Sequence, residues 1–146
     1  MKRSEASIQT FLLDTNVFIS AIKEPKKQTD TLKLIIKIIS EPRFALVGNY
    51  LLAYGLLRYA ELLKSETAAA LLATLLSKMQ VVDVSKNYRK ICKRYIKTPD
   101  RADILHAATC LQTRAILITN DRHFDRIRDE GIIQVWNVSK AIRELI

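Results

Sequence analysis

The 146-residue sequence has few of the residues that break or cross-link a chain, with three glycines, three prolines and two cysteines. Cys92 and Cys110 cannot build a framework of several disulfides, and in a reducing compartment they are expected to be buried small hydrophobic residues. The sequence also has no repeat, no low-complexity segment and no linker. We therefore expect a single domain over residues 1–146, with one hydrophobic core.

Long hydrophobic segments are missing too. The N-terminal MKRSEASIQT has no apolar core of a signal peptide, and no apolar run approaches the ~18 residues of a membrane span. A cytoplasmic protein that does not enter a membrane is expected. Neither GxxxxGKS/T nor GxGxxG occurs, which argues against the common nucleotide-binding loops.

Acidic residues are scarce relative to basic ones, since 15 Asp and Glu stand against 24 Lys and Arg. The resulting net charge of +9 favours polyanionic partners, with nucleic acid first and an anionic membrane surface second. The alternative is a basic surface that only keeps the protein soluble.

Short runs rich in Ile, Val and Leu are predicted to be strands, and longer segments with helical spacing separate them. The predicted strands are Phe11–Leu13, Phe44–Val47, Val81–Val84, Ala115–Ile118 and Ile132–Val135. The predicted helices are Asp30–Ser40, Asn49–Leu63, Ser65–Met79, Ser85–Lys97, Asp100–Gln112 and Asn137–Ile146, with Pro25, Pro42 and Pro99 at junctions. Strands that alternate with helices indicate parallel βαβ units. The predicted fold class is α/β, a three-layer α/β/α sandwich with a parallel sheet of about five strands.

Three acids occupy special places in this scheme. Asp14 closes the first predicted strand, Asp103 lies in the first turn of a helix, and Asp121 follows the fourth strand. Each could simply cap a helix or complement its dipole. However, ligands of open parallel sheets bind outside the carboxyl ends of the strands. If the three acids converge there, they repel one another unless a cation lies between them, and an oxygen-only cluster suits Mg²⁺ or Mn²⁺.

Two stretches, FLLDTNVFIS from Phe11 and DILHAATCLQTRAILITNDRHF from Asp103, resemble the PIN domain family, which includes VapC-type toxins and RNA-processing nucleases. The resemblance implies an acidic Mg²⁺ or Mn²⁺ site that hydrolyses RNA, and it allows an antitoxin protein as a partner. The residues it implies are Asp14 and Asp103 as metal ligands, Asp121 as a ligand or a positioner of water, Asn16 and Asn120 as flanking polar groups, and Asp125 as an outer member.

The sequence departs from the family pattern at one position. The pattern places a Glu in the helix after the second strand, and the best register puts Tyr54 there. Glu61, seven residues further along, lies about 10 Å away along a helix axis. Two functions follow as hypotheses: a ribonuclease that works with three acids, with help from Asn49 or water, or an inactive module that binds RNA or a protein.

One predicted helix carries most of the net charge. From residue 86 to residue 101 there are seven basic residues and one acid, a net +6. Such a surface beside a phosphodiester site could track a phosphate backbone, although a solvated cationic face is the alternative. The residues predicted to bind nucleic acid are Lys86, Arg89, Lys90, Lys93, Arg94, Lys97 and Arg101, while Tyr88 and Tyr95 are expected on the apolar side.

The sequence gives less support to a zinc site built from histidine and cysteine. A zinc site from His106, His123 and the two cysteines lacks paired ligand spacing, and His106 is expected to be a partner of Asp103 or a core histidine.

LLDTN also resembles the opening strand of phosphoaspartyl hydrolases, but Asn16 replaces their second acid. The Ser65–Met79 helix is apolar enough for a homodimer interface, although Ala and Leu at this spacing are more often core.

Overall fold

The computed structural model describes residues 7–23, 29–63, 65–97 and 100–146. Five strands form one sheet in the order β3-β2-β1-β4-β5, and every pairing is parallel. The strands are β1 (Gln9–Leu13), β2 (Phe44–Gly48), β3 (Met79–Val81), β4 (Ile116–Ile118) and β5 (Val135–Trp136). The predicted five-stranded parallel sheet is confirmed, and all carboxyl ends of its strands lie at one edge.

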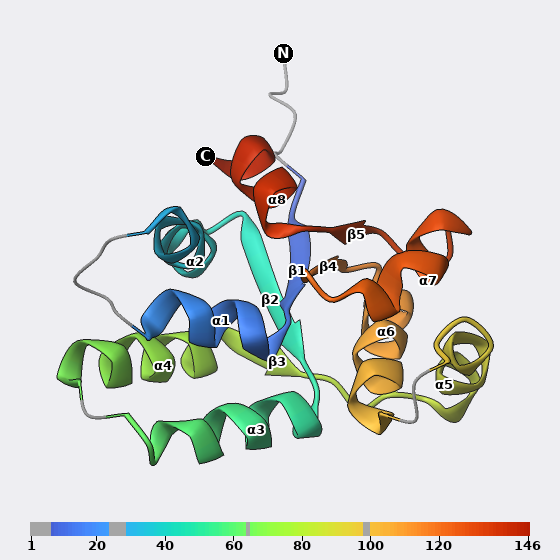
Figure 1. Ribbon diagram of the computed structural model, residues 1–146, viewed down its shortest axis with the longest axis horizontal. Coiled ribbons are helices and arrows are strands. Elements are labelled where there is room, and N and C mark those ends of the chain that lie inside the picture. Colours follow the sequence, from blue (N-terminus) through green and yellow to red (C-terminus); the bar gives the residue numbers. More distant parts are fainter. Residues whose placement is uncertain (1–6, 24–28, 64, 98–99) are drawn as a thin grey trace.

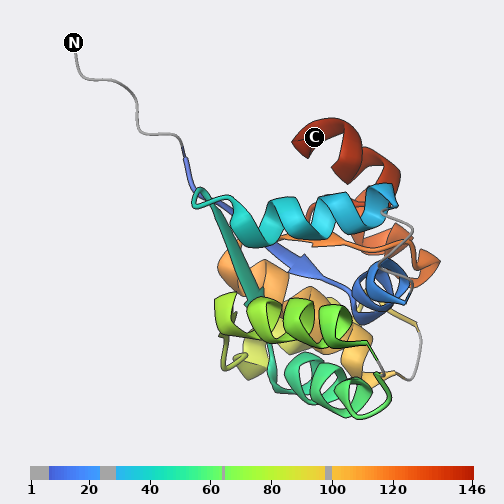
Figure 2. The same ribbon diagram turned by 90° about the vertical axis from the view of Figure 1, so that its left-hand side faces the viewer.

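Helices cover both faces of the sheet, as Figure 1 shows. One side carries α1, α2 and α4, and the other carries α5, α6 and α7, while α3 contacts both α4 and α6. Figure 2 shows α2, α3 and α4 in front of the sheet. The helical segments are α1 (Thr15–Ile22), α2 (Asp30–Ser40), α3 (Tyr50–Ala60), α4 (Glu66–Lys78), α5 (Lys86–Lys93), α6 (Arg101–Thr113), the short 3₁₀ helix η2 (Arg122–Phe124), α7 (Asp125–Asp129) and α8 (Val138–Leu145).

The central strands are buried on both faces. Phe11, Leu12 and Leu13 of β1 are at most 2% exposed, and all of β4 is buried. A strand covered on both sides must be apolar at every position, which explains why these strands appear in the sequence as continuous hydrophobic runs.

The strand order reverses between β1 and β4. The chain leaves β1 toward β2 and β3 on one side of the sheet, and it later returns to form β4 and β5 on the other side. Leu13 lies opposite Ile118, so the residues that follow β1 and β4 begin side by side. Open parallel sheets bind ligands at such a point, outside the carboxyl ends of the strands.

Several element boundaries differ from the sequence prediction. β3 begins at Met79 and β5 at Val135 because the register with β2 and β4 sets where pairing occurs, so the predicted Val81–Val84 and Ile132–Val135 strands are displaced. The predicted helix over Ser85–Lys97 ends at Lys93, where shorter-range bonds from the Arg94 and Tyr95 amides close its last turn. Pro42 lies in the turn before β2, whereas Pro25 and Pro99 lie outside the described residues.

Within the described ranges, none of the helices has the length and apolar character needed to cross a bilayer.

Lys78, the last residue of α4, caps the end of another helix. Its ammonium group donates hydrogen bonds to the carbonyl oxygens of Ile38 (2.5 Å), Ile39 (3.1 Å) and Glu41 (2.9 Å), which lie at the end of α2 and just after it. Partial burial lowers the pKa of Lys78. The contact joins two helices of the same layer and satisfies carbonyls that have no partner within α2.

Replacing Lys78 by Met keeps most of the side-chain volume but removes the ammonium group. We expect the free energy of unfolding to fall by about 1–3 kcal/mol, because hydrogen bonds from a charged donor are lost. Urea denaturation measures this change. Lys33→Met is the matched control, since Lys33 pairs only at 3.9 Å with Asp30 on the surface, and equal stability losses for the two variants would contradict the capping role.

Candidate active site

Asp14 stands at the junction of β1 and α1. It occupies the N-cap position of α1, but its side chain makes no capping hydrogen bond. Instead, Oδ2 accepts a hydrogen bond of 2.7 Å from the hydroxyl of Thr119, while Oδ1 accepts none within the described residues. The side chain is 9% exposed. Helix capping therefore does not account for the carboxylate at this position.

Thr119 links Asp14 to the segment that follows β4. Its hydroxyl oxygen also accepts a hydrogen bond of 3.0 Å from the backbone N–H of Asp121. Asp121 caps η2, because its Oδ1 accepts a bond of 2.9 Å from the N–H of His123. The hydroxyl of Thr119 thus sets the relative positions of the acids at the ends of two neighbouring strands.

Asp103 approaches from α6. The capping of this helix is done by Asp100, whose Oδ1 accepts a bond of 2.8 Å from the N–H of Ala102. The carboxylate of Asp103 is therefore left for another contact, and its Oδ2 lies 3.0 Å from Nδ1 of His123. Asp103 is buried, and burial raises its pKa, while the hydrogen bond from His123 opposes that rise.

His123 lies between two of the acids. Its Nδ1 is 3.0 Å from Asp103 Oδ2 and 3.2 Å from Asp121 Oδ1. A ring nitrogen that faces two carboxylates must carry a proton to avoid repulsion between lone pairs. Accordingly, the hydrogen bond to Asp103 and the charge of Asp121 raise the pKa of His123.

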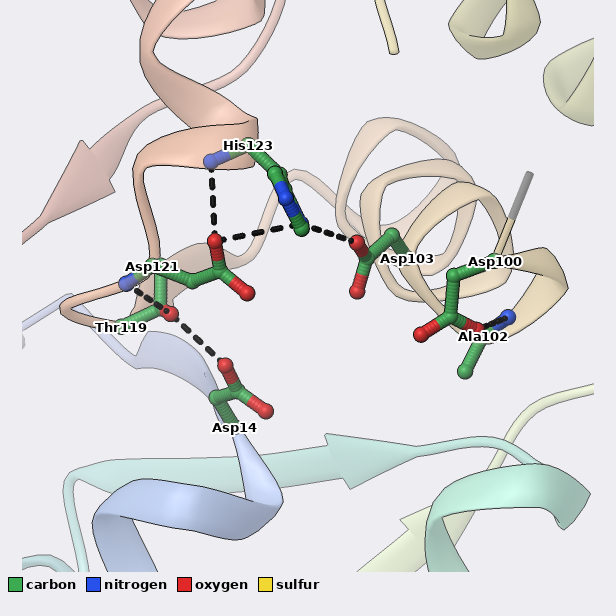
Figure 3. A network of polar contacts seen from close by, with 7 residues as sticks. All are labelled: Asp14, Asp100, Ala102, Asp103, Thr119, Asp121 and His123. Carbon is green, nitrogen blue, oxygen red and sulfur yellow. Dashed lines mark hydrogen bonds and ion pairs between the residues drawn. The ribbon is translucent and has the colours of Figure 1, made fainter. Parts of the chain in front are cut away.

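Figure 3 shows the carboxylates of Asp14, Asp103 and Asp121 directed toward a common space, with Asp100 beyond Asp103. Donor atoms of Asp103, Asp121 and His123 lie within 4.8 Å of one another, close enough to hold one metal ion. Asp14 is not part of this 4.8 Å group, and its connection to Asp121 runs through the hydroxyl of Thr119. The set is rich in carboxylate oxygens and has one imidazole, which fits Mg²⁺ or Mn²⁺ better than a thiolate-seeking metal.

The remaining predicted residues lie in different surroundings. Asn16 and Asn120 line a cleft of about 270 Å³ together with Asp14 and Asp121. Asn120 also accepts a bond of 3.0 Å from the N–H of Val138 and so ties the end of β4 to α8. Asp125, predicted as an outer member, pairs at 3.3 Å with Arg128 of its own helix.

Tyr54 stands where the family pattern has a Glu, and Asn49 was considered as its substitute. Tyr54 lies in α3, and Asn49 is the N-cap of that helix. Tyr54 is 58% exposed, and its ring lies 5.8 Å from the guanidinium of Arg58. Asn49 is fully buried and caps α3 through a bond from the N–H of Leu52. The Asn49 Nδ2 group contacts His106 Nδ1 and Thr109 Oγ1, both at 3.0 Å, so this side chain is committed to the core.

The cysteines and His106 are core residues. Burial raises the pKa of Cys92 to about 12, raises the pKa of Cys110 and lowers that of His106. A neutral buried thiol is neither a nucleophile nor a ready metal ligand. His106 contacts Asn49 and is a core histidine, which is one of its two predicted roles. The other predicted role is wrong, because the histidine that contacts Asp103 is His123.

His123 is the residue that the sequence alone did not assign to the site. The only local signal is its spacing, since it follows Asp121 by two residues, the distance at which an Asp side chain caps a backbone N–H. Contact with Asp103 depends on how α6 packs beside η2, which no local pattern encodes.

The basic residues divide into two groups. Lys86, Arg89, Lys90 and Lys93 of α5 face the start of α6, where Arg101 completes the lining of one cavity. Arg94 and Lys97 follow the end of α5 and are exposed outside this cavity. Tyr88 and Tyr95 pack against the core, as expected.

Comparisons with known proteins agree with the fold. The family model described as the PIN domain matches residues 11–130. No curated protein matches the sequence. Among solved structures, VapBC2 from Rickettsia felis bound to a promoter DNA fragment is 20% identical, with a TM-score of 0.64 over 88% of this chain and 98% of that one.

Two further structures show the same fold. VapBC-1 from nontypeable Haemophilus influenzae is 22% identical, with a TM-score of 0.62 over 90% of this chain and 100% of that one. PAE2754 from Pyrobaculum aerophilum is 17% identical, with a TM-score of 0.57 over 96% and 98% of the two chains.

We expect the pKa of His123 in the metal-free protein to lie above its ordinary value of about 6.5, as measured by NMR titration in EDTA. Asp103→Asn should lower it, because the strongest stabilising partner of the imidazolium is lost. A raised folded-state pKa means that the contact stabilises the fold fully below about pH 6.5, and that this contribution disappears as the pH rises through the folded-state pKa. A pKa unchanged by Asp103→Asn would contradict the contact.

Asn49→Ala should lower the free energy of unfolding by about 2–4 kcal/mol, because a helix cap is lost and buried partners are left unsatisfied. Mn²⁺ affinity, measured by calorimetry on the folded variant, should not change. Asn16→Ala is the control, since exposed Asn16 should affect stability by less than about 0.5 kcal/mol. Weaker Mn²⁺ binding after Asn49→Ala would mean that Asn49 reaches the metal.

Proposed function

This chain belongs to the PIN domain family, and from that premise we propose that it is a Mg²⁺- or Mn²⁺-dependent ribonuclease that hydrolyses phosphodiester bonds in RNA. The observation that carries the proposal is the convergence of three carboxylates from distant parts of the sequence. Asp14 and Asp121 come from the ends of adjacent strands, and Asp103 comes from α6. Only a cation or a proton donor makes such a group stable.

The residues that would hold the metal are Asp14, Asp103 and Asp121. A bound Mg²⁺ or Mn²⁺ would activate water as a nucleophile and neutralise charge that develops on the phosphodiester. Thr119 holds one oxygen of Asp14 and leaves the other facing the site. His123 keeps a proton between Asp103 and Asp121 in the metal-free protein, and its exposed ring can move without disturbing the core.

A second candidate function rests on Tyr54. The family pattern has an acid where this chain has an exposed tyrosine, and a phenol with a pKa near 10 is a poor metal ligand at neutral pH. A weakened or inactive site would leave a module that binds RNA or a protein. Against this alternative stands Asp100, whose negative charge acts on both Asp103 and His123 and adds to the field of the three acids.

The partners proposed are RNA and an antitoxin protein, and the site of action proposed is the cytoplasm. VapBC structures from two organisms share the fold, which supports the antitoxin. A homodimer through the Ser65–Met79 segment has less support. α4 buries Ala68, Leu72 and Leu75 in the core, so the apolar spacing that suggested an interface is used within the chain.

RNA cleavage tests the proposal. The wild-type protein should cleave a mixed single-stranded RNA pool with Mn²⁺ and not with EDTA, and Asp14→Asn or Asp103→Asn should reduce the rate by at least about a hundredfold, since each change removes a metal ligand. Asp125→Asn is the matched control and should retain activity, because Asp125 pairs with Arg128.

Equal cleavage by the wild type and both ligand variants would indicate a contaminating nuclease and contradict the proposed site. RNA binding in EDTA without any cleavage in Mn²⁺ would instead favour the binding module.

A further inference from the structure

A cavity of about 360 Å³ lies between α5, the start of α6 and the first turn of α3. Its apolar lining comes from Leu51, Ile104 and Leu105. Five cations and Tyr50 form the rest, and the cations are Lys86, Arg89, Lys90, Lys93 and Arg101. The volume is at the lower end of the range for small-molecule sites, so it suits one nucleotide-sized group rather than a folded partner.

The cations of this cavity have no counter-ion among the residues that the structure describes. No acid lines it, and none of its five cations forms an ion pair within the residues that the structure describes. In addition, Nε of Arg89 is buried and has no hydrogen-bond acceptor there. A buried donor without an acceptor costs free energy, so the cavity is electrostatically incomplete without an anion.

Tyr50 adds an aromatic surface to the cavity. Its side chain is 58% exposed, although it is the first residue of α3 and lies next to buried Asn49. No ring or cation contact engages it among the described residues, whereas equally exposed Tyr54 stacks with Arg58. A free aromatic ring beside apolar side chains and cations is the combination on which unpaired nucleobases stack.

The cavity lies close to the acids through α6. Arg101 and Ile104, which line it, are two residues before and one residue after Asp103, so all three lie within one turn of about 5.4 Å. Asp103 and the two lining residues lie on different faces of that turn, so an RNA strand bound in the cavity would cross the start of α6 to reach the acidic site.

We propose that this cavity binds an unpaired nucleotide of a single-stranded RNA, with the base against Tyr50 and the apolar residues and the phosphates against the cations. The inference rests on the proposed function and adds the place where one nucleotide of its substrate is held. In a duplex the bases are stacked and paired, so no base face is available to Tyr50.

Fluorescence anisotropy in EDTA tests binding without cleavage, with a labelled single-stranded oligoribonucleotide of about ten nucleotides. Tyr50→Ala should weaken binding about tenfold, whereas Tyr50→Phe, which keeps the ring, should change it less than about twofold. Tyr54→Ala is the control with equal exposure and should have no effect. Lys90→Gln and Lys93→Gln should each reduce the salt dependence by about 0.7 in logarithmic slope.

The same oligoribonucleotide in duplex form should bind more weakly and lose nothing further on Tyr50→Ala. Single-strand affinity that Tyr50→Ala leaves unchanged would overturn the proposal, even in a protein whose Mn²⁺-dependent cleavage needs Asp14, in which case the proposed function stands. If Tyr50→Ala weakens binding but the wild-type protein shows no Mn²⁺-dependent cleavage, the cavity binds RNA as proposed and the proposed nuclease function is contradicted.

A polyglutamate peptide serves as the competing class of ligand. If it binds as tightly as the RNA and loses as much affinity on Tyr50→Ala, the cavity recognises an acidic protein segment, and the nucleotide proposal is overturned.

Discussion

Repulsion among carboxylates is the constraint on which the site depends. Asp14, Asp103 and Asp121 face one space, and like charges gathered in this way repel one another unless a cation or a proton donor compensates them. In the metal-free protein the compensation is local: the hydroxyl of Thr119 donates to Asp14, and a protonated His123 lies between the other two acids. These contacts offset part of the repulsion without a metal ion.

The sheet topology creates this cluster. The parallel pairing of β1 with β4 brings the ends of two strands together where the strand order reverses, and α6 brings Asp103 to the same edge. α6 also separates two functions on its first turn. Asp103 faces the acids, while Arg101 and Ile104 face the cationic cavity. α6 thus contributes residues both to the proposed metal site and to the proposed RNA-binding cavity.

Much of this could be predicted from the sequence, because strands buried on both faces leave continuous apolar runs and the acids follow them directly. Strand ends were less predictable, since the Met79 and Val135 starts depend on register with a neighbour rather than on local composition. Asp14 and Asp121 each precede a helix and were both possible caps from the sequence, yet only the side chain of Asp121 caps. His123 was missed because its contact with Asp103 arises from packing between distant segments.

Crystals soaked with Mn²⁺ and measured for anomalous scattering test the central claim most directly. An anomalous peak with oxygen ligands from Asp14, Asp103 and Asp121, accompanied by movement of the His123 ring away from Nδ1 contact with Asp103, is the predicted result. Failure of Mn²⁺ to bind between these carboxylates at saturating concentration, or a peak that excludes Asp14, would contradict it.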